Sequence, residues 1–209
     1  MTAGSDSSHW EGVHSTRGET EVSWFQASPE PSLRLIERAG IAPSASVIDV
    51  GGGASRLVDA LLDRGFASVA VLDLSAAALG RSRARLGSRA AAVDWIVADA
   101  TAWTPTIPYD LWHDRAAFHF LTEEPQRAAY VERLRAALRP GGHAIVATFA
   151  LDGPERCSGL PVVRYDGESL ARALGPGFER VETVADLHRT PSGGEQRFQF
   201  SLFRRLADV

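Results

Sequence analysis

The chain has 209 residues, 44% of them hydrophobic, which suits one globular domain with a substantial core. A net charge of −4 and a pI near 5.9 leave no basic field, which disfavours nucleic acid as a substrate. The single cysteine, Cys157, excludes an internal disulfide, residues 1–8 are too polar for a secretion signal, and no apolar stretch approaches the length of a membrane span. We therefore expect a soluble, cytoplasmic protein.

The first part of the chain divides into a polar start and an aromatic segment. Residues 1–8 are rich in serine, glycine and threonine and are expected to be loose. Residues 9–25 contain Trp10 and Trp24 and are too aromatic for a passive tail. We predict that residues 1–27 are a flexible start followed by an aromatic segment that covers a ligand, and that residues 28–209 form a single domain.

From Pro29 onward, helical and strand patterns alternate. Periodicity and capping residues predict helices over 29–39, 55–64, 76–86, 125–138 and 168–174. Short β-branched and apolar runs predict strands over 46–50, 68–72, 93–98, 109–113, 143–149, 178–187 and 196–205. The Pro191–Gly194 turn joins the last two strands into a hairpin. The regular β-α order implies an α/β fold with a mostly parallel sheet and helices on both faces.

The run Val47–Ser55 predicts a ligand site. A buried strand breaks into Gly51, Gly52 and Gly53, and a helix follows at once. A helix amino terminus presents free N–H groups, and glycine lets a ligand approach the backbone closely, so an anionic or nucleotide-like ligand is expected here. The alternative is a glycine-rich turn with no ligand.

Two nucleotide-binding classes fit this loop poorly. A dinucleotide fingerprint needs a third glycine where this chain has Arg56, and a phosphate-binding P-loop needs a lysine, which the chain lacks altogether.

Acids recur at the predicted strand ends, at Asp49, Asp73, Asp99 and the pair His113 and Asp114. A single aspartate at a strand end is a common turn former. Ligands of open parallel sheets lie beyond the carboxyl ends of the strands, so several aspartates at these ends favour a ligand site. Asp73 follows Gly53 by 20 residues, a spacing that suits a contact to ribose hydroxyls. Asp99 is placed to accept from an adenine amino group.

Four segments resemble successive motifs of class I S-adenosylmethionine (SAM) methyltransferases. They read Val-Ile-Asp-Val-Gly-Gly-Gly, Val-Leu-Asp-Leu-Ser, Val-Ala-Asp-Ala and Leu-Arg-Pro-Gly-Gly-His, in that order within residues 30–150. The resemblance implies a Rossmann-like, seven-stranded sheet with an antiparallel last strand, and SAM as cofactor. The cofactor-binding residues that we predict are Trp24, Asp49, Gly51, Gly52, Gly53, Asp73, Leu74, Asp99, Ala100 and His113.

A narrower resemblance begins at Trp112. The segment Trp-His-Asp-Arg-Ala-Ala is similar to the Trp-Asp-Arg-Gly-Ala segment of thiopurine-methyltransferase-like enzymes and to the Asp-Lys-Gly-Thr segment of certain lysine methyltransferases. The chain departs from both by inserting His113 and by placing Ala116 where the former have glycine. Because acceptors in these relatives range from small thiols to protein lysines, the acceptor does not transfer.

Polar side chains near the fourth strand and in later loops are candidates for chemistry. His113, Asp114 and His119 are predicted as proton acceptors, although His119 equally suits a satisfied core position. The residues predicted to contact the acceptor are Arg115, Cys157, Leu160 and His188. No cluster has metal-ligand spacing, so no metal is expected.

These features predict a SAM-dependent methyltransferase that transfers the sulfonium methyl group to a thiol, amine or hydroxyl of a small molecule or a protein side chain. Two alternatives remain. One is a SAM-binding regulator or catalytically silent scaffold with the same fold. The other is a nicotinamide-dependent reductase, which Arg56 and Asp99 disfavour.

Overall fold

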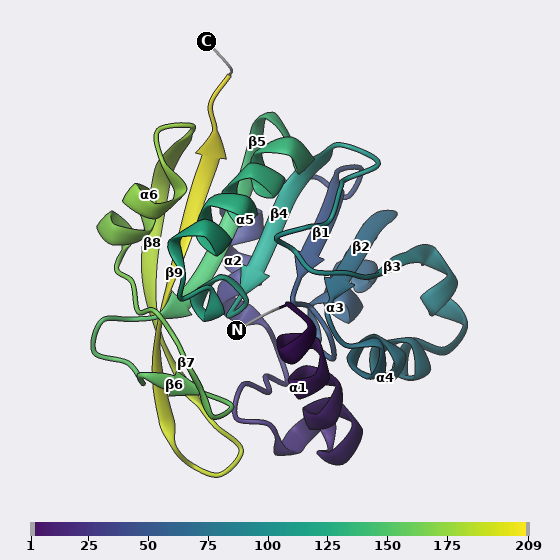
Figure 1. Ribbon diagram of the computed structural model, residues 1–209. Helices are drawn as coiled ribbons and strands as arrows, with labels where there is room; N and C mark the ends of the chain where they lie inside the picture. Colours follow the sequence, from purple (N-terminus) through teal and green to yellow (C-terminus); the bar gives the residue numbers. More distant parts are fainter. Residues whose placement is uncertain (1–2, 208–209) are drawn as a thin grey trace.

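A seven-stranded sheet organises the chain, of which the computed structural model describes residues 3–207 (Figure 1). In sheet order the strands are β3 (Val93–Val97), β2 (Ser68–Asp73), β1 (Ser46–Val50), β4 (Tyr109–Arg115), β5 (Leu138–Phe149), β9 (Glu195–Arg205) and β8 (Phe178–Arg189). The first five pair in parallel, and β9 runs antiparallel to both of its neighbours. The predicted Rossmann-like sheet with an antiparallel last strand is confirmed.

Helices cover both faces of this sheet. They are α2 (Glu30–Arg38), α3 (Leu57–Asp63), α4 (Ala76–Leu86), α5 (Glu124–Ala137) and α6 (Gly167–Leu174), whereas α1 (Ala3–Thr16) packs against α4 at the carboxyl end of the parallel strands (Figure 1). One core layer joins the sheet to α2, α3 and α4 through Leu33, Leu57 and Leu79. The other joins it to α5 and α6 through Tyr130 and Leu170. Because both faces of the sheet are covered, the central strands β1 and β4 are buried at nearly every position, including the polar side chains Asp49, His113 and Asp114.

Short elements complete the chain. They are the 3₁₀ turns η1 (Glu19–Glu21), η2 (Gly87–Ala92) and η3 (Phe118–Phe120), and a small hairpin of β6 (Arg156–Cys157) and β7 (Leu160–Pro161). The hairpin lies between the predicted strand 143–149 and the predicted helix 168–174, where no strand was predicted. β5 begins five residues earlier than predicted, because a register shift between Tyr109 and Leu111 of β4 accommodates its Pro-Gly-Gly run.

The start of the chain is more ordered than its composition predicted. Helix α1 begins at Ala3, within the segment expected to be loose, and Met1 and Thr2 lie outside the described residues. Its serine and glycine content favours helix only weakly. Tertiary contacts hold it instead: the Glu11 carboxylate accepts from Ser75 Oγ at 2.8 Å and from Ala77 N at 3.2 Å, at the amino end of α4. These hydrogen bonds lower the pKa of Glu11.

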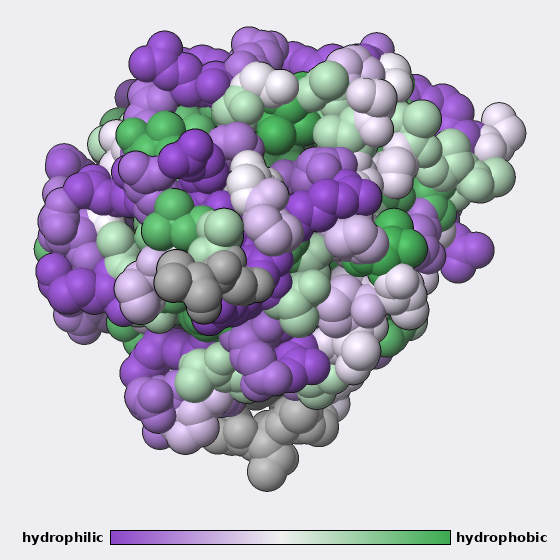
Figure 2. Space-filling model, turned by 90° about the horizontal axis from the view of Figure 1, so that it is seen from above, coloured by the Kyte–Doolittle hydropathy of each residue, from purple (hydrophilic) through white to green (hydrophobic). Residues whose placement is uncertain are grey.

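The two ends of the parallel strands carry different features. The end seen in Figure 2, near the amino ends of the parallel strands, is mostly hydrophilic with scattered apolar spots. The opposite end carries the glycine loop and α1 (Figure 1). Within residues 3–207, no helix is both long and apolar enough to cross a membrane.

Candidate functional site

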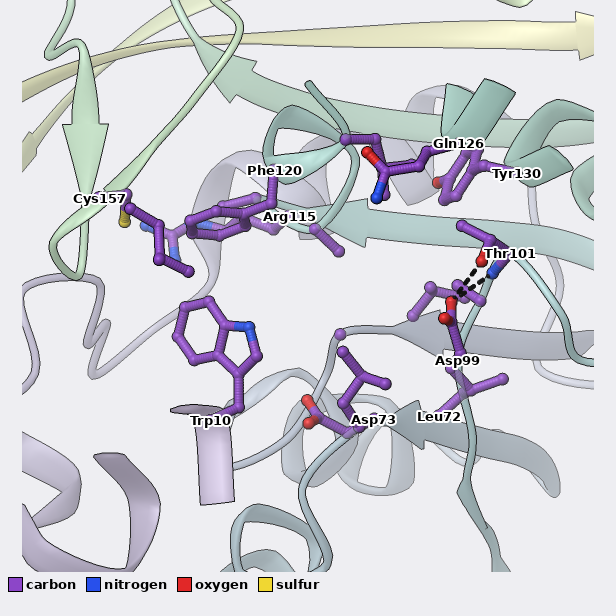
Figure 3. Close-up of a pocket in the computed structure, with 18 of the residues that line it drawn as sticks. Trp10, Leu72, Asp73, Asp99, Thr101, Arg115, Phe120, Gln126, Tyr130 and Cys157 are labelled. Carbon is purple, nitrogen blue, oxygen red and sulfur yellow. Dashed lines mark hydrogen bonds between the residues drawn. The ribbon is translucent and has the colours of Figure 1, made fainter. Parts of the chain in front are cut away.

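A cavity of about 380 Å³, here called the main cavity, opens at the carboxyl ends of β1, β2 and β4 (Figure 3). Strand order reverses between β1 and β4, which is where ligands of open α/β sheets bind. The volume lies within the range of small-molecule sites. Asp73 and residues 98–101 line one part, and Trp10, Phe120 and Cys157 line another.

A second cavity of about 70 Å³ adjoins the main cavity and shares Gly51, Asp73 and Arg115 with it. Its wall is the glycine loop together with Asp49 and His113. The two spaces therefore form one continuous region that runs from the ends of β2 and β3, past the glycine loop, to the end of β4.

Most residues predicted from the sequence line this region. Those in the main cavity are Trp24, Gly51, Asp73, Leu74, Asp99, Ala100, Arg115, Cys157 and Leu160. Those that the second cavity adds are Asp49, Gly52, Gly53 and His113. Asp114, His119 and His188 line neither cavity, and His188 instead borders an open groove between the segment after η1 and the β8–β9 hairpin.

The glycine loop is too tight for side chains. Gly51 and Gly53 have φ angles of +68° and +36°, and the N–H of Gly51 donates to Leu72 O at 2.7 Å. A Cβ on Gly51 would lie 2.7 Å from Ala117 Cβ, and one on Gly52 would lie 2.5 Å from Asp49 Oδ2. The loop therefore exposes bare backbone to the cavities, as a close-fitting ligand requires.

Asp73 ends β2 and faces the main cavity. One oxygen accepts from Ser75 N at 2.8 Å, and a Cβ on Gly53 would approach the other at 2.8 Å. Burial raises the pKa of Asp73 to about 7, the Ser75 N–H opposes this, and the nearby Asp49 carboxylate adds to it. A carboxylate in such surroundings is stabilised by hydroxyl groups or a cation in the cavity.

Asp99 shapes the next strand end. Its Oδ1 accepts from Thr101 N at 2.8 Å and from Thr101 Oγ1 at 2.7 Å, which fixes the turn after β3 (Figure 3). Ala100 and Leu72 line the cavity beside it. This part of the cavity therefore combines apolar side chains with a carboxylate, a combination that suits an adenine ring and its amino group.

Aromatic side chains close the other part of the cavity. The Trp10 ring lies 4.9 Å from that of Phe120 and 5.8 Å from that of Trp24, both edge-on. In Figure 3 the Trp10 ring lies on the same side of the pocket as Phe120 and Cys157. Burial raises the pKa of the Cys157 thiol to about 12, so the thiol stays protonated at neutral pH and is a poor nucleophile.

Arg115 lies where the two cavities meet. Its Nη1 donates to Trp24 O at 2.9 Å, and its guanidinium carbon lies 4.9 Å from the centre of the Phe198 ring. Nε and Nη2 are buried and have no acceptor within the described chain. Burial lowers the pKa of Arg115 to about 10, which leaves it charged at neutral pH. An unpaired edge of a buried guanidinium is costly unless an anion completes it.

The predicted proton acceptors are all engaged or enclosed. His113 Nδ1 lies 2.7 Å from Asp49 Oδ1, and its Nε2 lies 2.8 Å from Ser32 Oγ. Asp114 accepts from Ala117 N at 2.8 Å and from the Tyr130 hydroxyl at 2.6 Å. Neither side chain has both a free polar atom and access to the main cavity.

His119 and His188 are held by the protein itself. His119 is fully buried in η3, and burial together with the Arg115 charge lowers its pKa to about 3. His188 Nε2 lies 2.7 Å from Ser23 O, which ties β8 to the segment after η1. The structure therefore does not bring these two histidines to the cavity.

Several lining residues escaped the sequence prediction. His14, Phe120 and Gln126 border the main cavity, and His14 also borders the second. Trp10 and His14 are four residues apart on α1, so a helical interpretation of this segment would have placed both on one face. Burial lowers the pKa of His14, and its Nδ1 has no partner among the described residues.

Arg56, which occupies the third glycine position of a dinucleotide fingerprint, has a different use. Its Nε pairs with Glu19 Oε1 at 2.7 Å, and Arg85 reaches the same oxygen at 3.1 Å. Arg85 also donates to Ser55 O at 2.7 Å. This cluster fastens η1, and with it the base of the aromatic segment, to the glycine loop. No group of histidine, cysteine and acidic side chains in residues 3–207 is arranged to hold a metal ion.

Comparisons with known proteins find similarity to methyltransferases. Residues 47–142 match the family described as a methyltransferase domain. Trans-aconitate 2-methyltransferase of Azoarcus sp. (strain BH72) is 34% identical over 109 residues, which are 52% of this chain and 40% of that protein. A probable thiol methyltransferase of Arabidopsis thaliana is 27% identical over 165 residues, 77% of this chain and 70% of that protein.

The chain shares its fold with a solved structure. A SAM-dependent methyltransferase from Anabaena variabilis superposes with a TM-score of 0.74 at 16% identity, covering 97% of this chain and 94% of its own. The family match begins in β1, whose carboxyl end carries the glycine loop that borders both cavities. Residues 47–142 are thus similar to the methyltransferase-domain family, and the whole chain shares its fold with a SAM-dependent methyltransferase.

Proposed function

We propose that the protein transfers the methyl group of SAM to a thiol, amine or hydroxyl of a small molecule or a protein side chain. The observation that carries the proposal is one cavity that joins a nucleoside-type half, built around Asp73, to an aromatic half at Trp10. Because the chain covers only 40% of the first relative, that relative's acceptor is not carried over.

The residues present fit the cofactor. Asp73 offers a carboxylate to the ribose hydroxyls, and residues 98–101 border the adenine. Glycines 51–53 leave no room for a Cβ and so let the backbone lie against the methionine part. Asp49 Oδ2 is buried without a partner beside this loop, as a carboxylate awaiting an ammonium group would be. When bound, SAM supplies a methyl group that its sulfonium has already activated.

The protein's own contribution is alignment and exclusion of water. Trp10, Trp24 and Phe120 form an apolar wall beside the expected methyl group, so an acceptor held against them is oriented and partly dehydrated. Leu160 and Pro161 of the small hairpin extend this wall. A wall of this kind favours an acceptor whose thiol, amine or hydroxyl group is carried on an apolar frame.

The proton of a neutral acceptor needs a receiver with a free atom at the cavity. The geometry favours His14, which borders both cavities and has an unpartnered Nδ1, over His113, Asp114 and His119. A lowered pKa keeps His14 neutral at pH 7 and so able to accept a proton. A thiolate acceptor would need no receiver.

The test is binding followed by transfer. Calorimetry should show binding of S-adenosylhomocysteine (SAH) and of SAM but not of NAD. Labelled SAM should then methylate at least one member of a panel of thiols, small amines, phenols and protein extract. Binding without transfer across the panel would favour the SAM-binding regulator, and NAD binding without SAH binding would overturn the proposal.

Arg115 supports a more specific prediction. The sequence predicted that Arg115 contacts the acceptor. In the structure, Arg115 lines the second cavity together with the glycine loop, and its Nε and Nη2 atoms have no partner in the described chain. This position suits a contact to the carboxylate of the cofactor. We expect Arg115→Met to weaken SAH binding by roughly tenfold, since a charge-assisted contact is lost. An unchanged dissociation constant for SAH, together with a raised KM for the acceptor, would mean that Arg115 contacts the acceptor and not the cofactor.

A further inference from the structure

His113, the residue that this chain inserts before Asp114, belongs to a buried hydrogen-bonded series. Asp49 of β1 and His113 of β4 are direct neighbours in the parallel register, so their side chains leave the same face of the sheet. Asp49 Oδ1 lies 2.7 Å from His113 Nδ1, and His113 Nε2 lies 2.8 Å from Ser32 Oγ on α2. None of the three is more than 2% exposed.

The chemistry of the partners fixes how the series is arranged. A carboxylate only accepts, so His113 Nδ1 carries the proton that it shares with Asp49. In the neutral imidazole, Nε2 then accepts from the Ser32 hydroxyl. Both nitrogens of His113 are therefore hydrogen-bonded. The partners come from β1 and α2, which are distant in sequence from β4. A ring fixed in this way holds one carboxylate oxygen of Asp49 in place.

The order serine, histidine, aspartate is also that of a nucleophilic triad, but this one is unable to work as such. The Ser32 side chain is fully buried against the sheet and lines neither cavity, so no acyl group reaches its oxygen. The series therefore acts by holding a side chain in place, and that side chain is Asp49.

The free end of the series is Asp49 Oδ2. This atom has no partner in the described chain, and Asp49 borders the second cavity beside the glycine loop. Gly52 allows the approach, because a Cβ there would lie 2.5 Å from Oδ2. Rotation of the carboxylate would turn Oδ2 away from the cavity, and the bond from His113 to Oδ1 opposes that rotation.

We propose that His113 and Ser32 are positioning residues, which hold Asp49 so that its second oxygen receives the ammonium group of the cofactor's methionine part. The proposal rests on the proposed function, because it takes SAM as the ligand. It assigns His113 a role through Asp49 instead of a proton transfer to the acceptor. It also ties α2, which follows the aromatic segment, to the loop that the ligand touches.

Two substitutions separate the contacts of His113. The amide nitrogen of glutamine lies near the place of histidine Nε2, and that of asparagine lies near Nδ1. His113→Gln therefore keeps the Ser32 contact and loses the Asp49 contact, and His113→Asn does the reverse. We expect His113→Gln to weaken SAH binding by about tenfold, His113→Asn to recover most of that loss, and Ser32→Ala to cost about threefold.

The decisive probe is 5′-methylthioadenosine, which keeps the adenosine and the sulfur but lacks the amino acid part. Calorimetry with wild type and His113→Gln should show a loss for SAH and none for methylthioadenosine. An equal loss for both ligands would mean a general structural defect and would overturn the positioning role, as would no loss for SAH. If wild type binds neither ligand, the proposed function itself fails.

Further variants protect the test from misfolding. Asp49→Asn should weaken SAH binding as much as His113→Gln does, and the double variant should lose no more than either alone, because both remove one contact. Independent, additive losses would contradict the series. His143→Gln is the matched control, since His143 pairs with Leu111 of β4 outside both cavities, and the variant's affinity for both ligands should equal that of wild type.

Discussion

Replacing Asp73 by asparagine should weaken SAH binding by roughly 10- to 100-fold, because the carboxylate's charge-assisted hydrogen bonds to two ribose hydroxyls are lost. The same change should make the ligand-free protein more resistant to heat at pH 8. Asparagine keeps an oxygen for Ser75 N, so the turn after β2 is retained. Calorimetry and thermal melts on the same preparations measure both effects.

The gain in stability follows from the sign of the pKa shift. Burial raises the pKa of Asp73 from 3.8 to about 7 in the folded protein, so folding favours the protonated form. Below pH 4 the carboxyl is protonated in both states and costs nothing. Between pH 4 and 7 the unfolded state ionises first and the wild type loses stability, and above pH 7 the loss is constant. Asp73 borders the open cavity, so we expect a difference of about 1–2 kcal/mol.

Ligand binding should have the opposite dependence on pH. Ribose hydroxyls donate to the ionised carboxylate, so the affinity of wild type for SAH should rise several-fold from pH 6 to pH 8 and then level off. Asp73→Asn should show a flat profile over the same range. The charged groups that act on Asp73 are the carboxylates of Asp49 and Glu11, and both favour its protonated form.

Asp94→Asn is the matched control, because it makes the same change on the neighbouring strand β3 outside both cavities. Its SAH affinity should equal that of wild type. A melting temperature of Asp73→Asn below that of wild type at pH 8 would show that the carboxylate stabilises the turn more than its burial costs. An unchanged affinity would mean that Asp73 only holds the turn before α4, through its hydrogen bond from Ser75 N.

The sequence predicted the features that depend on local pattern. β1, β2 and α4 were placed to within one residue, because alternation of buried strands with capped helices is a strong local signal. Asp73 and Asp99 reach the cavity because every parallel strand ends on the same edge of the sheet. Connectivity alone therefore brought most cofactor-binding candidates to one place.

What the sequence could not show depends on long-range contacts. His113 and Ser32 are 81 residues apart, and their contact exists only because β1 and β4 are neighbours beneath α2. The periodic pattern also left open whether His119 faces core or cavity, and η3 turns it into the core. Helix α1 was missed because its own residues favour helix weakly and contacts with α4 supply the rest.

Replacing Trp10 by alanine should weaken SAM binding by about tenfold and SAH binding by about threefold. Trp10 borders the main cavity from α1 and packs edge-on against Phe120 (Figure 3). An aromatic face attracts a sulfonium cation, whereas SAH carries no charge on sulfur. The expected difference between the two ligands therefore reports on where Trp10 lies relative to the transferable methyl group.

The fold should survive this change. Trp10 is partly exposed at the cavity wall, and Glu19, bound by Arg56 and Arg85, fastens the segment that follows α1. We therefore expect the melting temperature to fall by only a few degrees. Trp10→Phe should recover part of the SAM affinity, because a smaller aromatic face remains.

Trp95→Ala provides the matched control, since it removes a partly buried tryptophan from β3, away from both cavities. It should lower stability and leave both dissociation constants unchanged. Equal losses of SAM and SAH affinity in Trp10→Ala would mean that the ring only fills space beside the ligand. No loss of either, together with normal methyl transfer, would show that α1 packs against α4 without covering the cofactor. A selective loss of SAM affinity would place the aromatic segment over the sulfonium, where it excludes water from the reaction.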